Sequence, residues 1–312
     1  MKLARTVLGD VRADALGVCY AHEHLVIDGG VPSIINPEIS LPDVETAVEE
    51  VRGCTDAGVR TMVDAMPADA GRNVVKLADI SRRTGVHVIV ATGLHHARYY
   101  GSRHWSELLE PSELAELFIA DIEVGVDAFD YNGPVVRRTP HRAGIVKTAG
   151  SDGGPSARDR RTFEAAALTA SRTGVPVLTH CEGGTGALEQ IKLLDDLDVP
   201  LARVVLSHTD KVVDHGYHRD LLGSGACVVY DQGIRTPDQT ARLVTQMVED
   251  GFTAQILLGT DGARRSLWMT LGGSPGLAAL RTDLGARLAA ALGHDVVRQL
   301  WIDNPARILA LV

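Results

Sequence analysis

The sequence predicts a (β/α)8 TIM barrel, and two observations carry this prediction. Eight short runs of apolar and β-branched residues recur along the chain, and segments of helical pattern separate them. Strict alternation of strands and helices indicates a parallel sheet, whose strands are buried on both faces and therefore apolar throughout. Eight such units close into a barrel, and an open doubly wound sheet is the rival arrangement. The eight predicted strands are residues 17–24, 58–65, 86–93, 143–149, 175–180, 203–208, 226–231 and 254–261.

Two of the intervening segments carry explicit helix boundaries. The segment before the second strand begins at Asp43 and stops at Gly58, and the segment before the fifth begins at Ser156 and stops at Gly174. Asp and Ser accept hydrogen bonds from the free amides of a first turn, and glycine readily ends a helix. Both segments are therefore predicted to be helices that lead directly into the next strand.

Two connections are longer than the others. Residues 94–142 join the third and fourth strands, and residues 262–294 follow the eighth. The second connection contains Trp268 and several glycines, which is typical of a loop that folds over a site. Because the chain has no low-complexity tract and no linker-like stretch, we expect one domain over residues 1–312.

Composition excludes several classes of protein. With 312 residues and 45% hydrophobic content, the chain can bury a large core. The 31 basic residues are outnumbered by 40 acidic ones, and no basic run marks a nucleic-acid surface. No apolar run of about 18 residues predicts a membrane span, and charged residues interrupt any signal-peptide core near the start. Four cysteines without a CxxC pair favour a reducing compartment, so we expect a cytoplasmic protein.

The first predicted strand ends in the motif "HEH", formed by His22, Glu23 and His24. Two residues apart on one strand, the histidines point to the same side, and the glutamate points to the other. This is the geometry of a chelating pair, but such a pair carries little weight alone in a chain with 12 histidines. The positions of the other candidate ligands decide its meaning.

Three further candidate ligands end other predicted strands: His180 the fifth, His208 the sixth and Asp261 the eighth. In a barrel the C-terminal strand ends meet at one mouth, where active sites are built. Imidazoles and a carboxylate suit Zn²⁺ or a neighbouring divalent metal. Five such ligands exceed the three of a catalytic mononuclear zinc site, so we expect two metals, about 3.5–4 Å apart and joined by a bridging anion.

Lys147 ends the fourth predicted strand and would point into the same mouth. An ordinary salt-bridging lysine is the alternative interpretation. A lysine that is desolvated beside two cations becomes neutral, and a neutral amine can add carbon dioxide. The resulting carbamate would be the anionic bridge that two metals require.

These motifs resemble the phosphotriesterase-like lactonase family of the amidohydrolase superfamily. The similar segments are "HEH", "IVK", "THCEGGTGALEQI", "VLSH" and "LLGTD", and the likeness runs from "RTVLGDV" at Arg5 to "NPARIL" at Asn304. In that family the HxH pair and the aspartate hold one metal, the two later histidines hold the other, and a carboxylated lysine and a hydroxide bridge them. The resemblance assigns these roles to His22, His24 and Asp261, to His180 and His208, and to Lys147.

The resemblance implies a hydrolase with two divalent metal ions per chain, zinc first, with manganese and cobalt as alternatives. The metal-bridging hydroxide would attack the ester carbonyl of a lactone, and Asp261 would pass the proton to the leaving alkoxide. Organophosphate hydrolysis would be weak. A phosphotriesterase or amide hydrolase with the same metals and a non-catalytic, metal-stabilised binding barrel remain open alternatives. The partner would be a small lactone or ester, without nucleic acid or membrane, and the family resemblance implies a homodimer.

Three positions depart from the patterns of known subgroups. Enzymes with strong organophosphate activity have a histidine where Gln232 follows Asp231, and an acid where Lys211 stands, so their proton relay is not expected here. The acyl-homoserine lactonases have a tyrosine beside the metals where this chain has His95. His95 is therefore a candidate polar group at the mouth, with an ordinary loop histidine as the alternative.

A third subgroup opens phosphorylated sugar lactones and holds the phosphate with basic residues of the last two long loops. Arg264 in "DGARRSLW" resembles that pattern, and Arg235 is a second candidate, since guanidinium groups suit phosphate. The subgroup's tyrosine is Leu267 here, which leaves the phosphate cradle incomplete, and a solvated loop charge is the alternative for Arg264.

The remaining candidates are assigned by position alone. Tyr99 and Trp268 are predicted to line the substrate cavity, because they lie in the two long connections. Asp210, two residues after His208, is a candidate for orienting a metal ligand. Arg72, which follows the second strand, is interpreted as structural.

Overall fold

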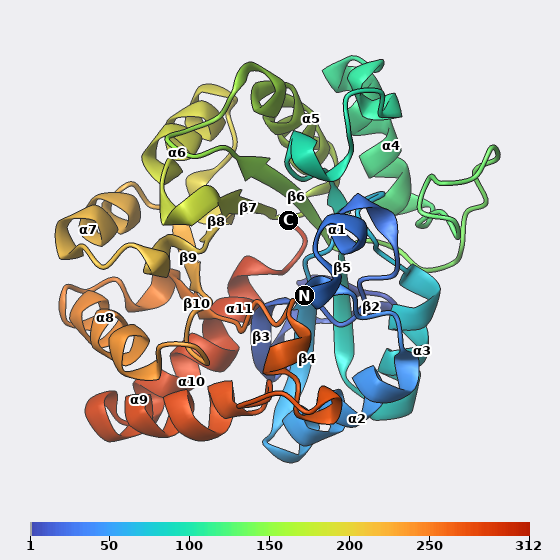
Figure 1. Cartoon of the computed structure of the whole chain (residues 1–312). Coiled ribbons are helices and arrows are strands. Elements are labelled where there is room, and N and C mark those ends of the chain that lie inside the picture. The colour runs from blue at the N-terminus through green and yellow to red at the C-terminus, as the bar shows by residue number, and fades with distance from the viewer. Residues whose placement is uncertain (1) are drawn as a thin grey trace.

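The computed structural model describes residues 2–312 and confirms the predicted barrel (Figure 1). The eight predicted strands form one parallel sheet in the order β10-β9-β8-β7-β6-β5-β4-β3. The backbone amides of Thr260 and Asp261 donate to the His22 carbonyl at 3.2 and 3.0 Å, which brings the last strand onto the first. The strands are β3 (Val18–Glu23), β4 (Val59–Asp64), β5 (His87–Gly93), β6 (Ile145–Gly150), β7 (Val177–Cys181), β8 (Val204–Ser207), β9 (Cys227–Tyr230) and β10 (Ile256–Leu258).

Helices surround the strands, and the two predicted helix boundaries are confirmed. The Asp43 side chain accepts from the amide of Thr46 and begins α2, and Ser156 begins α5 in the same way. The fifth helix ends before Gly174, whose φ of 71° suits glycine. The helices are α1 (Gly30–Ile35), α2 (Val44–Asp56), α3 (Val74–Thr84), α4 (Pro111–Glu123), α5 (Ala157–Thr173), α6 (Ala187–Asp196), α7 (His215–Gly223), α8 (Pro237–Glu249), α9 (Gly285–Leu292), α10 (His294–Arg298) and α11 (Asn304–Ile308).

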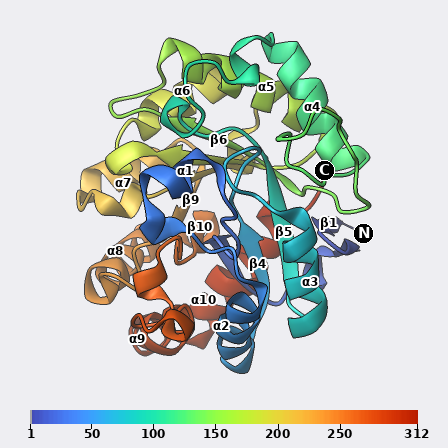
Figure 2. The ribbon, with the colours of Figure 1, turned by 45° about the vertical axis from the view of Figure 1, so that its right-hand side comes forward.

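An N-terminal hairpin, which was not predicted, covers the N-terminal end of the barrel. Its strands are β1 (Leu3–Thr6) and β2 (Gly9–Arg12), and the amide of Val7 donates to the carbonyl of Val88 near the start of β5. In Figure 2, β1 lies on the opposite side of the barrel from α1. The hairpin and the chain's last residues pack under the barrel interior, so the other end is left for a site.

The barrel interior is filled by apolar side chains at its N-terminal end and by polar ones at its C-terminal end. Ile145, Leu178 and Val229 pack together in the interior core. Two residues further along β6 and β7 the side chains on the same face are Lys147 and His180. Strand alternation thus carries Lys147 and His180 from the core side of β6 and β7 directly into the mouth.

A β-bulge directs the first pair of histidines into the barrel. Cys19 and Ala21 belong to the interior core, so simple alternation would turn His22 outward. The register of β3 against β4 shifts between Tyr20 and Glu23, which adds a residue to β3 and returns His22 to the interior face. Bulges often redirect side chains next to active sites, and this bulge places His22, the first histidine of the HxH pair.

The connection after β10 reaches the mouth only with its first residues, among them Arg264, which lines the cavity. Further along, the amides of Thr270 and Leu277 donate to the buried Glu50 carboxylate at 3.1 and 2.9 Å, so that part of the loop packs against α2. The cavity is also bordered by α1, which lies in front of the strands in Figure 1. A loop's length does not reveal which carboxylate will bind its amides, so the sequence could not show how much of this loop stays at the mouth.

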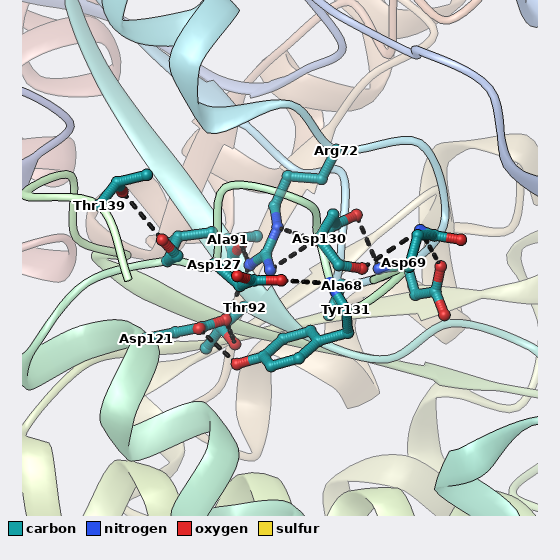
Figure 3. A network of polar contacts seen from close by, with 12 residues as sticks. Ala68, Asp69, Arg72, Ala91, Thr92, Asp121, Asp127, Asp130, Tyr131 and Thr139 are labelled. Atoms are coloured by element: carbon teal, nitrogen blue, oxygen red, sulfur yellow. Dashed lines mark hydrogen bonds and ion pairs between the residues drawn. The ribbon is translucent and has the colours of Figure 1, made fainter. Parts of the chain in front are cut away.

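A buried ionic network ties the long connection between β5 and β6 to the barrel (Figure 3). The Arg72 guanidinium, with no exposed surface, donates to Asp130 at 2.8 Å and to Asp121 at 3.0 Å. The amide of Asp69 donates to the other oxygen of Asp130 at 2.8 Å, and the Tyr131 hydroxyl donates to Asp121 at 2.6 Å. The interpretation of Arg72 as structural agrees with this arrangement.

Among residues 2–312, no helix is both long enough and apolar enough to cross a membrane. All four cysteines are buried and unpaired.

Candidate metal centre

A cavity of about 480 Å³ opens at the C-terminal ends of the strands. Side chains at or just past the ends of five strands line it, and they are the six predicted ligands, since β3 contributes both His22 and His24. The tertiary structure therefore brings together residues that are up to 239 positions apart in the sequence, as the C-terminal mouth of a barrel should. The six are His22, His24, Lys147, His180, His208 and Asp261.

Asp261 lies among the histidines at distances that suit a shared ion. Its Oδ1 atom is 3.5 Å from Nε2 of His24 and 4.0 Å from Nε2 of His22. Atoms that bind one ion at about 2.0–2.2 Å lie roughly 3–4 Å apart. Burial alone would raise the pKa of Asp261, but the imidazoles of His208, His24 and His22 outweigh it and lower the pKa.

Asp231, which was not predicted as a site residue, orients two of the histidines. Its carboxylate lies 2.9 Å from Nδ1 of His22 and 2.9 Å from Nδ1 of His208, and it is fully buried. Both rings are thereby held with Nε2 directed away from the carboxylate, as in carboxylate–histidine–metal arrangements. Burial would raise the pKa of Asp231, but the contacts with His208 and His22 hold it well below its usual range.

The sequence contained a signal for Asp231. It follows β9 two residues after Val229, which belongs to the interior core, so strand alternation turns Asp231 inward. Asp231 is also the last residue of a predicted strand, 226–231, as His180 and His208 are of theirs, so its position alone was a second signal.

The Lys147 amine is buried without a hydrogen-bond partner in the described part of the chain. Only 2% of the residue is exposed. Burial lowers its pKa to about 8, because the low-dielectric interior disfavours the charged form. A nucleophilic amine in this state, among five other candidate ligands, fits the predicted carbamate, which would supply the missing partner.

Burial holds His22 and His180 in the neutral form that binds a metal. Burial and then the nearby Lys147 lower the pKa of His22 to about 3. Burial and then His208 lower the pKa of His180 well below its usual value. Neutral imidazoles, one carboxylate and one desolvated amine form the donor set of a binuclear site, so the residues present fit two divalent ions.

Four of the predicted substrate contacts line the cavity: His95, Tyr99, Arg235 and Arg264. His95 lies with its ring 4.6 Å from that of His180, and its Nδ1 atom accepts from the amide of His96 at 2.8 Å. Its proton therefore lies on Nε2. Burial and then His180 lower the pKa of His95, so it presents an uncharged donor to a ligand.

Arg235 and Arg264 differ in how much of their guanidinium groups is free. Arg235 donates to the carbonyls of Asp231, Thr260 and Asp261 at 3.1, 2.7 and 2.7 Å, so it mainly holds the end of β10. Arg264 is exposed and makes no hydrogen bond or ion pair within residues 2–312. Arg264 is thus the arginine better able to bind a ligand's anion.

The structure corrects three predicted roles. Gln232 and Trp268 are not among the described residues that line the cavity. The Gln232 amide donates to Asp231 at 2.8 Å, and Trp268, 1% exposed, donates to the Gly262 carbonyl at 2.7 Å. Asp210 accepts from the backbone amide of Gln232 at 2.8 Å rather than from a ligand histidine. These side chains support the loops behind the site.

Comparison with known proteins places the chain in a family. A model of the phosphotriesterase family matches residues 1–309. A phospho-furanose lactonase from Mycoplasmopsis synoviae is 30% identical over 324 residues, which cover 99% of this chain and 92% of that protein. The chain therefore belongs to the phosphotriesterase family, and the resemblance read from its motifs is confirmed.

Solved structures agree with this family assignment. The crystal structure of an amidohydrolase from Mycoplasma synoviae matches with a TM-score of 0.96 and 29% identity, and covers all of this chain and 92% of its own. A lactonase from Listeria monocytogenes matches with a TM-score of 0.92 and 26% identity over 99% of each chain. The barrel and its mouth are thus shared with hydrolases of this superfamily.

Proposed function

We propose that this protein is a metal-dependent hydrolase that opens the ring of a lactone bearing a phosphate group. The observation that carries the proposal is the unpartnered amine of Lys147 among four histidines and Asp261 at the mouth of the barrel. The relatives named phospho-furanose lactonase support the choice of substrate.

The six ligands would hold two divalent ions, zinc first, with Lys147 carboxylated as the bridge. Such ions supply Lewis-acid activation of the ester carbonyl and of a water molecule. Asp231 contributes by holding His22 and His208 in one orientation before any ion arrives. Pre-organised ligands bind more tightly, because less freedom is lost on binding.

Two residues of the chain are placed to act on the substrate. The Asp261 carboxylate lines the cavity, and its low pKa keeps it ionised, so it can accept a proton from the attacking water and deliver it to the leaving alkoxide. The Nε2–H group of His95 is an uncharged donor for the lactone's oxygens. Opening a ring in this way releases no fragment, so both product groups remain in one molecule.

The phosphate would bind Arg264. Its guanidinium is exposed at the cavity rim, and Lys211 and Arg98 line the same cavity. A planar guanidinium suits phosphate through two parallel hydrogen bonds. Lys211 occupies the place of the acid that phosphotriesterases use in their proton relay, which favours an anionic substrate over a neutral phosphotriester.

A matched pair of substrates tests the proposal. We expect the metal-loaded enzyme to hydrolyse a phosphorylated furanose lactone with a kcat/KM about 10²-fold above that for the same lactone without phosphate, as for loss of a charge-assisted bidentate contact. Arg264→Ala should raise KM for the phosphorylated lactone alone. Arg265→Ala is the control, because Arg265 lies beside it but does not line the cavity. Equal rates for both lactones would contradict the phosphate assignment.

The alternatives give different results in the same assays. Turnover of an aryl phosphotriester or an amide, without lactone turnover, would favour the other hydrolases of this class. Two bound ions with no turnover of any ester would favour a binding barrel.

Two further properties belong to the proposal. Buried, unpaired cysteines suit a reducing compartment, so we place the protein in the cytoplasm. The resemblance to the lactonases supports a homodimer, which size-exclusion chromatography with light scattering would test.

A further inference from the structure

A second carboxylate, outside the six ligands, converges on the metal centre from the loop after β7. Glu182 follows His180 by two residues, just past the end of β7 at Cys181, and both residues line the cavity. Its Oε2 atom lies 2.8 Å from Nε2 of His180. Glu182 thus contacts Nε2 of His180 and leaves Nδ1 of that ring for an ion. Asp231 does the reverse, because it contacts Nδ1 of His22 and of His208 and leaves their Nε2 atoms free.

Two residues of another loop hold Glu182 in place. Arg98 forms a two-pronged pair with it, Nη1 to Oε1 at 3.2 Å and Nη2 to Oε2 at 3.1 Å. Nε2 of His96 lies 3.0 Å from Oε2, and the His96 ring meets that of His180 edge-on at 4.8 Å. His96 is 7% exposed. The carboxylate is therefore held from the side of the neighbouring loop, while part of it stays exposed to the cavity.

The residues that hold Glu182 belong to the loop that also forms a wall of the cavity. His95 and Tyr99, which line it, are the immediate neighbours of His96 and Arg98. The guanidinium of Arg98 lies over the Tyr99 ring, 5.2 Å from its centroid. One carboxylate thus connects a metal ligand to the segment that contacts the substrate.

We propose that Glu182 is a positioning residue that selects the Nδ1 nitrogen of His180 for metal binding, and that Arg98 and His96 anchor it to the cavity wall. The neutral ring can carry its proton on either nitrogen, and the Glu182 contact places it on Nε2. The role rests on the proposed metal centre, but it concerns a residue that is not itself a ligand.

Stepwise metal binding tests the role. Titration of metal-free protein with Co²⁺, followed by calorimetry, should show two ions in the parent protein. In Glu182→Ala we expect the affinity of the ion held by His180 and His208 to fall about 10- to 100-fold, as for loss of an orienting partner. The other ion should keep its affinity within about threefold, and Glu182→Gln should lose less, because an amide oxygen still accepts from Nε2. Glu189→Ala, an exposed carboxylate on α6, is the control.

Arg98→Gln separates the two halves of the role. It leaves the contact between Glu182 and His180 but releases the cavity wall. Because Arg98 itself lines the cavity, KM is measured with the lactone that lacks phosphate, and it should rise severalfold while both metal affinities stay within about threefold. Arg103→Gln, exposed on the same loop, is the matched control. An Arg98 variant that loses metal as Glu182→Ala does would overturn the division between orientation and anchoring.

A readout without metal keeps the inference independent of the proposed function. In metal-free protein with ¹⁵N-labelled histidine, the ring of His180 should be protonated on Nε2, and Glu182→Ala should convert it to a mixture of the two forms. An unchanged ring would overturn the inference even if two ions bind. Two other results would also overturn the inference. One is that Glu182→Ala lowers the affinity for both ions equally and lowers the melting temperature of the metal-free protein. The other is a third ion bound by Glu182 itself. Fewer than two ions in the parent protein would count against the proposed function alone, because the position of the proton on the His180 ring still tests the role of Glu182 in metal-free protein.

Discussion

Two buried clusters of charged residues lie in this barrel, and they differ in whether the chain satisfies them. Around Arg72, the guanidinium meets Asp121, Asp130 and the Ala91 carbonyl, and Thr92 donates to Asp121 at 2.8 Å (Figure 3). At the metal centre, the Lys147 amine and Nδ1 of His24 have no partner within the described chain.

The difference separates structural charge from functional charge. A buried ion is costly unless hydrogen bonds and counter-charges surround it. Around Arg72 the chain supplies two carboxylates as counter-charges, and its Nη2 atom, which has no hydrogen bond, still lies 2.6 Å from Oδ1 of Asp130. The mouth of the barrel contains the neutral His22, an ionised Asp261 and the Lys147 amine, which has no hydrogen-bond partner. The described chain therefore does not supply all the partners that this cluster needs. Partners from outside the chain are therefore expected at the mouth and not at Arg72.

The largest expected effect is at the centre of the incomplete cluster. Lys147→Ala removes the proposed bridge, and we expect bound metal to fall below one ion per chain and kcat/KM to fall about 10³-fold or more, since the ions supply several kcal/mol of stabilisation. Metal analysis and lactone assays measure both. The metal-free variant should be no less stable than its parent, because the amine has no partner to lose. Retained metal and activity would remove Lys147 from the site.

The complete cluster should respond in the opposite way. Arg72→Met leaves Asp121 and Asp130 buried without their shared cation, so unfolding in urea should show a loss of about 3–5 kcal/mol. Metal content and kcat of the folded protein should hardly change, because no contact of Arg72 reaches the mouth. Arg83→Met, which breaks the surface pair with Glu45, is the control and should change stability little. A metal-deficient but stable Arg72 variant would contradict the division between the clusters.

Asp231 belongs to the metal centre although it is not a ligand. Asp231→Asn removes the charge that holds His22 and His208, and metal affinity should fall about 10- to 100-fold. Asp210→Asn is the matched control, because Asp210 is equally buried but bonds only a backbone amide. Competition with a chelator measures both affinities. Equal losses would mean that burial of an acid, and not its contact with the histidines, matters.

The smallest effect is expected at Trp268. Trp268→Phe removes the hydrogen bond to the Gly262 carbonyl, which contributes about 1 kcal/mol to stability. KM should be unchanged, because the indole does not reach the cavity. A marked rise in KM with unaltered stability would return Trp268 to the substrate site.

The sequence predicted the structure correctly where a regular repeat of strands and helices applied. Strand and helix alternation predicted the barrel, and the position of His180 at a strand end predicted that it would reach the mouth. The hairpin β1–β2 was missed because it lies outside the repeating unit. Asp210 lies two residues from His208 in sequence, but the carboxylate that reaches the His208 ring is that of Asp231, because the neighbouring strand β9 brings it there.

What the sequence determined by itself is the architecture and the set of ligand types, because both follow from residue pattern and strand alternation. What the tertiary structure decided is orientation. A bulge in β3 turns His22 inward, and a left-handed backbone conformation at His208, with φ of 68°, directs its ring. The carboxylate of Asp231 then contacts one ring nitrogen of His22 and of His208, and that of Glu182 contacts one of His180. Such choices depend on contacts between strands far apart in the chain, and local sequence does not encode them.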